Sequence, residues 1–181
     1  MVLSILLGLS FWLERATDVP LLHAPKQARH DPDTLVDNFV LYRHDEKGRL
    51  QYRLSAPRMA HFPDDDSTEV TQPLLIHFRP DSSRLILQGE TARITDTGKH
   101  VLIEKNVVVT RTALGKRAEM TLETPELTVL PEAGLAFNQK PVRIREGASW
   151  ITGTGLKMDQ NTGIFQLRSR VRAEYTNPVE K

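Results

Sequence analysis

The segment GETARITDTGKHVLIEKNVVVTRT, residues 89–112, decides the fold, because it contains a strand, a turn and a return strand in succession. Ala92 and Ile94 alternate with polar residues, and Asp96 to Gly98 supply a turn. The alternation resumes at four apolar positions: Val101, Ile103, Val107 and Val109. A two-residue period on both sides of a turn predicts antiparallel, half-buried strands.

The same pattern recurs twice further along the chain. Each copy has two alternating apolar residues, a glycine and a later valine, with the first and last positions fifteen residues apart. The three sets are Ala92, Ile94, Gly98 and Val107; Leu127, Val129, Gly134 and Val142; and Leu156, Met158, Gly163 and Val171. Fixed spacing with changing residues predicts a repeated β unit whose turns need glycine at positive φ. We therefore expect a stack of similar hairpins.

Composition sets bounds on the function. A chain of 181 residues with 39% hydrophobic and 26% charged residues fits one globular domain with a short appendage. The formal net charge of +1 provides no global field for nucleic acid, so we expect no nucleic-acid partner. Because the chain has no cysteine, disulfides, thiolate metal sites and cysteine nucleophiles are excluded.

The N-terminal segment 2–13, VLSILLGLSFWL, is apolar except for two serines and ends at Glu14. Twelve helical residues span about 18 Å, which is less than the ~30 Å hydrocarbon layer. We interpret residues 1–16 as part of a membrane anchor helix whose natural start lies upstream of Met1. One alternative is a signal peptide, although this segment has no basic region before its apolar run. The other is an N-terminal helix packed on the body.

Residues 17–36 contain three prolines and many charges, which is typical of an extended linker. The folded domain is then expected at 37–177, with a first hairpin around Asp45 to Gly48. No long amphipathic helix follows, and many short strands at near-regular spacing predict an all-β sandwich, barrel or roll.

Signals for catalysis are weak. His61 and the acidic residues Asp64 to Asp66 are expected to form a solvated turn without a metal, since no second histidine cluster supports a site. The sequence has no nucleophile-elbow, P-loop or dinucleotide motif, so we predict no enzyme, no catalytic residue and no cofactor.

Two strand faces carry positive signals. Arg168, Arg170 and Arg172 alternate along one predicted strand, and Lys140, Arg143 and Arg145 occupy the matching place one repeat earlier. Such a basic face could meet phosphates, although alternating arginines more often stay solvated and discourage edge aggregation. The second signal is apolar, because branched and aromatic residues recur on one face of almost every strand and could line an elongated interior.

Four segments carry a resemblance to a known family. They are FWLERA at 11–16, RHDPDTLVDNF at 29–39, DEKGRLQYRLSAPRMAHFPDDDSTEV at 45–70 and GETARITDTGKHVLIEKNVVVTR at 89–111. In this order they resemble the inner-membrane-anchored, periplasmic C component of the bacterial lipopolysaccharide export machinery. The repeat alone resembles the wider family of lipopolysaccharide-transport β-rolls.

The resemblance implies a single open β-jellyroll of two antiparallel sheets around a V-shaped slot, without catalytic residues. It also implies a place in the inner membrane, single-pass, with the domain in the periplasm. The implied partners are lipopolysaccharide, an inner-membrane ABC transporter complex that extracts it, a periplasmic bridge protein of the same fold, and the membrane through the anchor. Rival functions are a structural adaptor that joins partners by edge strands without lipid, and a carbohydrate-binding jellyroll of the cell envelope.

The inward candidates of the strands are expected to line the acyl-chain slot: Phe78, Ile94, Ile103, Val109, Leu122, Val129, Phe137, Ile144, Met158 and Leu167. The terminal strands, expected at 38–44 and 170–175, are predicted to bind partners by strand addition. The residues of this partner interface are Asn38, Val40, Tyr42, Arg170, Val171, Arg172 and Tyr175.

Overall fold

The computed structural model of the protein describes residues 30–159 and 162–176. Its described residues form twelve strands in one antiparallel ladder and one short 3-10 helix, which confirms the all-β antiparallel prediction. In chain order the elements are β1 (Thr34–His44), β2 (Leu50–Phe62), β3 (Ser67–Thr71), β4 (Leu74–Phe78), β5 (Arg84–Gln88), β6 (Thr91–Thr95), η1 (Asp96–Gly98), β7 (His100–Arg111), β8 (Met120–Leu130), β9 (Leu135–Phe137), β10 (Pro141–Glu146), β11 (Ser149–Asp159) and β12 (Ile164–Glu174).

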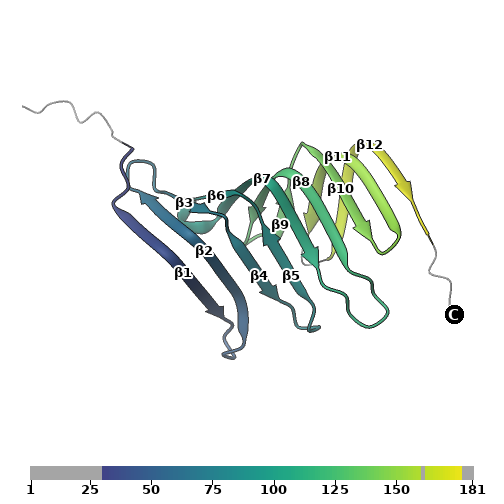
Figure 1. Ribbon diagram of the computed structural model, residues 1–181, viewed down its shortest axis with the longest axis horizontal. Helices are drawn as coiled ribbons and strands as arrows, with labels where there is room; N and C mark the ends of the chain where they lie inside the picture. Colours follow the sequence, from purple (N-terminus) through teal and green to yellow (C-terminus); the bar gives the residue numbers. More distant parts are fainter. Residues whose placement is uncertain (1–29, 160–161, 177–181) are drawn as a thin grey trace, which may run out of the picture.

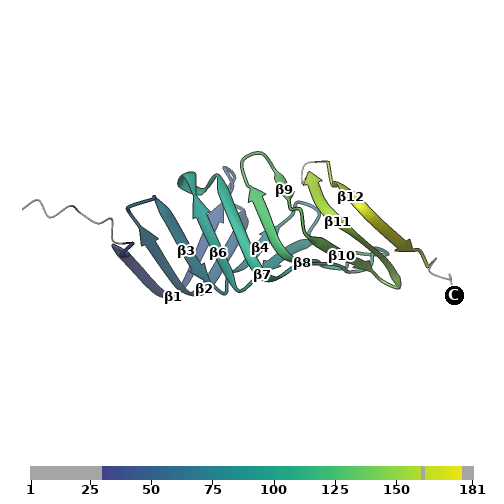
Figure 2. The same cartoon turned by 90° about the horizontal axis from the view of Figure 1, so that it is seen from above.

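The long strands change partners along their length. β2 pairs with β4 near its start and with β3 near its end, and β7 pairs with β6 and then with β5. β8 and β11 likewise pair with β10 in one half and with β9 in the other. We call the part around β4, β5 and β10 sheet I, and the part around β3, β6 and β9 sheet II. The ladder is thus one bent strip, elongated, with β1 and β12 at opposite ends (Figures 1 and 2).

A line of irregular backbone, which we call the crease, separates the two sheets. Five residues on it have φ between 51° and 76°: Asn38, Lys105, Asn106, Gly155 and Arg170. The strand registers also shift there, between Glu104 and Val107 and between Thr152 and Thr154. Such bulges bend a strand and increase its twist, so the inner faces of sheets I and II turn toward each other.

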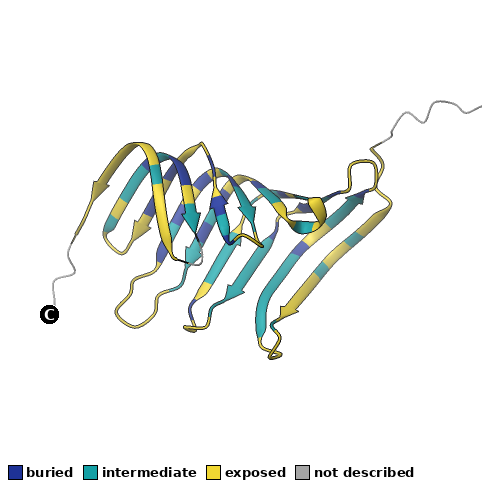
Figure 3. Cartoon of the chain, turned by 180° about the vertical axis from the view of Figure 1, so that it is seen from behind, coloured by how far each residue is buried: buried dark blue, intermediate teal, exposed yellow. Residues whose placement is uncertain are grey.

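Apolar side chains form cross-strand rows on these inner faces. In sheet I every member of the row is paired in register with the next, from β1 to β12: Leu41, Leu54, Leu75, Leu87, Val109, Leu122, Ile144, Ile151 and Ala173. In sheet II a second row runs through Val36, Met59, Val70, Ala92, Ile103 and Leu127. The buried residues lie in the middle strands, whereas the terminal strands are mostly exposed (Figure 3).

The fifteen-residue repeat predicted from the sequence is confirmed. Ala92, Leu127 and Leu156 are all buried on the inner face of sheet II. The three turn glycines, Gly98, Gly134 and Gly163, have φ values of 93°, 64° and 71°. Val107 and Val142 follow on the far side of the crease with 0% and 3% exposure, whereas Val171, the last of the third set, lies on the terminal strand β12 and is 50% exposed. Each unit is therefore a strand of sheet II, a turn, and a return strand that crosses the crease.

The domain begins earlier than predicted. β1 starts at Thr34, and this residue is already in register with His61 of β2, so the expected linker of 17–36 ends before it. The short run of apolar residues before Asp37 gave no clear period. The predicted anchor, 1–16, lies outside the described residues, as does the end of the predicted domain beyond residue 176.

The inward orientation predicted for two phenylalanines is wrong. Phe137 is 37% exposed and pairs with Thr128 and Lys157 on the outer face, while its neighbour Ala136 is 4% exposed inside. Phe78 pairs with Arg84 on the outer face of sheet I, where the guanidinium lies 5.7 Å from the ring centre. Both strands are apolar on consecutive positions, and such runs do not define which face is inward.

A buried asparagine fixes the crease where β9 ends. Asn138 is 4% exposed, and its side-chain amide donates to Thr124 Oγ1 at 2.7 Å and to the Glu126 carbonyl at 2.8 Å. Its side-chain oxygen accepts from the Leu156 N–H at 3.0 Å. The side chain thus ties β8 to β11 at a point where no strand lies between them, and a buried polar group of this kind is costly to leave unpaired.

Asn138→Leu should lower the free energy of unfolding by about 2–3 kcal/mol, because an apolar side chain of similar size removes the buried hydrogen bonds to Thr124 Oγ1, the Glu126 carbonyl and the Leu156 N–H. Gln139→Leu, at the exposed neighbouring position, should change it by less than about 0.5 kcal/mol. Urea unfolding followed by circular dichroism measures both variants. Equal stabilities would contradict a structural role for the asparagine network.

Candidate functional site

The space between the two sheets is nearly filled by side chains. An apolar cavity of about 80 Å³ remains there, lined by residues such as Leu75, Leu87 and Leu122 of sheet I and Val129 and Met158 of sheet II. Sites for drug-sized ligands usually measure ~300–1,000 Å³, so this cavity is too small for an acyl chain. The deep part of the slot is closed in this structure.

The interior widens on the side away from the crease, in a region that we call the mouth. One hollow of about 370 Å³ lies between His77 and Met120 of sheet I and Met158 and Phe165 of sheet II. A second hollow of about 560 Å³ continues from it toward β12, where Ile151 and other apolar side chains line it. Both hollows are of ligand size, and both open from the apolar inner faces.

Charged and aromatic groups line the mouth on sheet I. Arg111 is in register with Leu85 and Met120, so it belongs to the inner face, and its side chain is only 11% exposed. Its guanidinium contacts the Glu146 carboxylate at 2.5 Å. His77 stacks on Tyr52 with the ring centres 4.3 Å apart. Burial, together with the nearby Arg79 charge, lowers the pKa of His77, so the ring is mainly neutral at pH 7.

The apolar rows end on exposed strands. Leu41 on β1 is 56% exposed, and Phe165 and Val171 on β12 are 42% and 50% exposed. Within residues 30–159 and 162–176, β1 pairs with β2 alone and β12 pairs with β11 alone. Each terminal strand therefore presents one unpaired backbone edge next to an uncovered apolar face.

The structure brings eight of the ten predicted slot residues onto the inner faces. They are Ile94, Ile103, Val109, Leu122, Val129, Ile144, Met158 and Leu167, all of which belong to or pack against the buried core. Phe78 and Phe137 lie on the outer faces, as described above. Of the predicted partner interface, Asn38, Val40 and Tyr42 lie on β1, Arg170, Val171 and Arg172 lie on β12, and Tyr175 follows β12 with 79% exposure.

Sequence reasoning missed several residues of the interior. Leu75, His77, Leu85 and Leu87 face inward on β4 and β5, where apolar residues occupy both faces. Arg111 was also missed, although a signal existed, because it continues the alternation of Val107 and Val109. A charged residue at an alternating inward position should have been read as part of the site.

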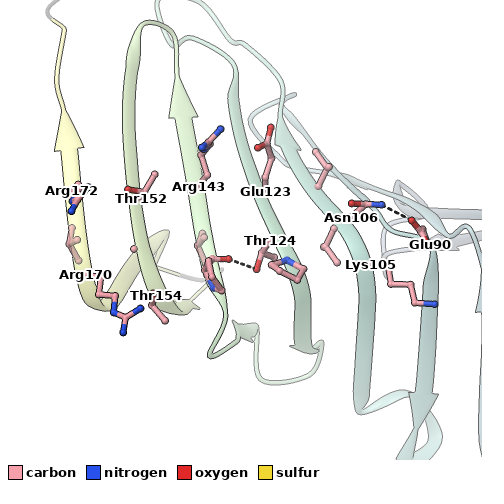
Figure 4. A pocket seen from close by; sticks show the side chains of 17 residues that line it. Glu90, Lys105, Asn106, Glu123, Thr124, Arg143, Thr152, Thr154, Arg170 and Arg172 are labelled. Carbon is pink, nitrogen blue, oxygen red and sulfur yellow. Dashed lines mark hydrogen bonds between the residues drawn. The ribbon is translucent and has the colours of Figure 1, made fainter.

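A further hollow, larger than the two at the mouth, lies on the outer surface along the crease (Figure 4). It has a volume of about 1180 Å³, and its lining is rich in polar side chains from β8, β10, β11 and β12. Arg143, Thr152 and Arg172 are paired in one cross-strand row, so two of the predicted basic positions share this outer wall. Apolar side chains such as Val108 and Pro125 also line it, so this groove combines charged and apolar surface.

An exposed cluster joins the start of the domain to the turn after β2. His30, Asp64 and Asp65 place potential ligand atoms within 4.8 Å of one another. The His30 ring stacks on Phe62 at 3.9 Å and contacts the Asp64 carboxylate at 3.0 Å, while Asp65 pairs with Arg93. These contacts explain why the cluster forms: they hold the residues before β1 against the turn that follows β2. His61 instead contacts Thr68 Oγ1 at 3.2 Å.

Among the described residues, no helix has the length and apolarity needed to span a bilayer.

The fold and the site together define a class of protein: an open-ended antiparallel β-roll with an apolar interior and a charged mouth.

Comparison with known proteins identifies the family. The family model described as lipopolysaccharide-assembly, LptC-related, matches residues 1–176, and the chain belongs to this family. Its role accordingly lies in lipopolysaccharide transport. No curated protein matches the sequence.

A solved structure shares the fold. It is that of LptH from Pseudomonas aeruginosa, described as the LptA-homologous periplasmic component of the conserved lipopolysaccharide transport device. The TM-score is 0.56 at 10% sequence identity, and the match covers 70% of this chain and 95% of that chain. The fold expected from the sequence thus agrees with that of a known transport β-roll.

Ile144→Asp should lower the free energy of unfolding by about 3 kcal/mol or more, because Ile144 is 5% exposed and an unpaired charge there would be buried. Arg145→Asp, one residue further along β10 on the outer face, is the matched control and should change it by less than about 1 kcal/mol. Urea unfolding of both variants tests the assignment of faces. A larger loss of stability in the Arg145 variant than in the Ile144 variant would mean that Arg145, not Ile144, faces the interior.

Proposed function

We propose that this protein is a non-catalytic lipopolysaccharide-transfer protein. It accepts lipopolysaccharide from an ABC-type extractor in the inner membrane and passes it, through the apolar slot, to a periplasmic bridge protein of the same fold. The N-terminal segment anchors it in the inner membrane as a single pass, and the β-roll lies in the periplasm.

The observation that carries this proposal is the continuity of the apolar row in sheet I. The row runs in register from Leu41 on β1 to Ala173 on β12, and apolar side chains are left exposed on both terminal strands. A conduit needs an apolar lining that does not end inside the molecule. A row that reaches both ends can continue into a neighbouring roll that adds a strand at either edge.

The energetics require such a lining. Each buried methylene contributes only ~0.8 kcal/mol, so several acyl chains need a long apolar surface to leave the membrane without a large penalty. Because the deep cavity measures about 80 Å³, the two sheets must separate when lipid enters. The mouth hollows of about 370 and 560 Å³ are where that separation begins.

Direction must come from another protein. The inner faces carry apolar side chains with the Arg111–Glu146 ion pair at the mouth, and among the described residues no group in this arrangement is suited to break or form a covalent bond. An ATP-driven extractor upstream supplies the work, and this chain supplies a path.

The structural adaptor is the alternative that a specific observation favours, because the middle of the roll is closed. An adaptor would keep this core filled and would use only the edges of β1 and β12. A carbohydrate site has less support: Trp150 is the one tryptophan after residue 16 that could serve as an aromatic platform, and it is 36% exposed and donates its indole N–H to Glu174 at 2.9 Å.

Photocrosslinking to labelled lipopolysaccharide separates conduit from adaptor. Photoreactive residues replacing Met158 and Leu167, which face inward and are partly buried, should capture lipid. Their neighbours Lys157 and Gln166 are paired with each other on the outer face and serve as matched controls that should not. Capture at outer positions only, or at none of the four, would contradict the conduit and leave the adaptor.

The two edges can be tested separately by proline, which removes a backbone donor and disfavours strand addition. Val171→Pro on β12 should abolish docking of the bridge protein in a pull-down while largely preserving lipid capture from the membrane side. Leu41→Pro on β1 is the reciprocal variant and should preserve docking of the bridge protein. Circular dichroism confirms that each variant is folded. Full retention of the bridge protein by a folded Val171 variant would move that interface away from β12.

A further inference from the structure

Three arginines from two neighbouring hairpins line the smaller hollow of the mouth. Arg79 follows β4, Arg111 ends β7, and Arg117 lies in the connection from β7 to β8. Glu146 is the one carboxylate among the described residues that line this hollow. The wall on the sheet I side is therefore strongly cationic.

Backbone hydrogen bonds hold these hairpins beside each other. In the β4–β5 turn, Arg79 donates its N–H to the Ser83 carbonyl at 3.0 Å. In the β7–β8 connection, Leu114 and Arg117 exchange two backbone hydrogen bonds of 3.0 Å. Thr112 donates to the Arg84 carbonyl at 3.0 Å and so joins one hairpin to the other. The cationic wall is built on paired backbone.

The positive charge of this wall is only partly compensated. Arg111 is paired with Glu146, yet its Nε is buried and has no hydrogen-bond partner in the structure. Within the described part of the chain, Arg79 and Arg117 have no carboxylate at ion-pair distance. Asp81 lies near both and offsets part of their charge, and its Oδ1 accepts from the Ser83 N–H at 3.0 Å and from the Ser83 hydroxyl at 2.5 Å.

The pKa of Asp81 agrees with this arrangement. Hydrogen bonds from Ser83 are the main cause that lowers it, and the charges of Arg79 and Arg117 lower it further. Both guanidinium groups thus lie close enough to the turn to act electrostatically on the same small region.

Below the arginines the hollow is apolar. Leu85 and Met120 line it from sheet I, and Met158 and Phe165 line it from sheet II. This hollow is continuous with the deep cavity, because Leu85 and Met158 line both of them. A cationic rim directly above an apolar interior matches an amphiphile with an anionic head group and apolar tails.

We propose that Arg79, Arg111 and Arg117 bind a phosphate on the head group of the lipid whose acyl chains enter the slot. This inference rests on the proposed function and adds to it the position and orientation of the cargo. Guanidinium groups bind phosphate oxygens through paired, charge-assisted hydrogen bonds. The incoming phosphate competes with Glu146 for Arg111 and supplies a partner to its Nε, so head-group binding weakens the ion pair at the mouth.

The test compares lipopolysaccharide with the same lipopolysaccharide after removal of its phosphates, both binding to the full chain. The variant is Arg79→Gln with Arg117→Gln, two positions outside the buried core. The matched control is Arg143→Gln with Arg172→Gln, which removes the same charge from the outer groove. Inorganic phosphate alone is a third ligand, and it distinguishes a lipid head-group site from a site for free phosphate.

The unmodified chain should prefer the phosphorylated lipid. The Arg79 and Arg117 double variant should lose at least about tenfold in affinity for that lipid, and its affinity for the dephosphorylated lipid should be unchanged. The control pair should bind both lipids as the unmodified chain does, and inorganic phosphate should not compete at concentrations that leave the lipid bound.

Three results would overturn the proposal. Equal affinity of the unmodified chain for both lipids would reject the phosphate site and leave the lipid conduit intact. An equal loss of affinity in the Arg143 and Arg172 control variant would show that net charge, not the mouth arginines, determines binding. Binding of neither lipid by the unmodified chain would reject the conduit itself, and the phosphate site with it.

Discussion

The structure depends on the in-register pairing of apolar side chains across successive strands. Each cross-strand pair contributes only ~0.2–1 kcal/mol, but the row of sheet I places one such pair between every two neighbours from β1 to β12. A slip of one residue would turn the whole row outward, so the hydrophobic effect fixes the register of all the strands in this row together. The same row that stabilises the roll also lines its interior.

This dependence explains which parts of the fold the sequence could predict. The segments with strict alternation, such as Ala92 to Ile94 and Leu156 to Met158, were assigned to the correct face, and their turn glycines were identified. The run Leu74–Phe78 is apolar at every position except His77, and β9 is Leu-Ala-Phe. In such strands only the pairing with neighbours determines the inward face, and single-strand periodicity does not contain that information.

The site was less predictable than the fold because its chemistry is assembled by register and by turns. Arg111 reaches the mouth because it continues the period of β7, whereas Arg79 and Arg117 reach it because two hairpins are joined side by side. The partners Glu146 and Arg111 are far apart in the sequence and meet only through the pairing of β7, β8 and β10. Only Arg111 has a local sequence signal, its place in the alternation of β7, whereas nothing in the local sequence around Arg79, Arg117 or Glu146 distinguishes it from a solvated surface charge.

The two long sides of the roll differ in how they are held, and this difference determines how it can open. At the crease the strands pass continuously from one sheet to the other, and Asn138 adds buried hydrogen bonds to Thr124, Glu126 and Leu156. At the mouth the contacts between sheets are apolar side chains such as Met158 and Phe165, which can slide or separate at little enthalpic cost. We therefore expect the sheets to separate by pivoting about the crease. The mouth, which Arg79, Arg111 and Arg117 line, would widen first. A lipid whose head group is held at that rim would keep its acyl chains directed toward the apolar rows as the sheets part.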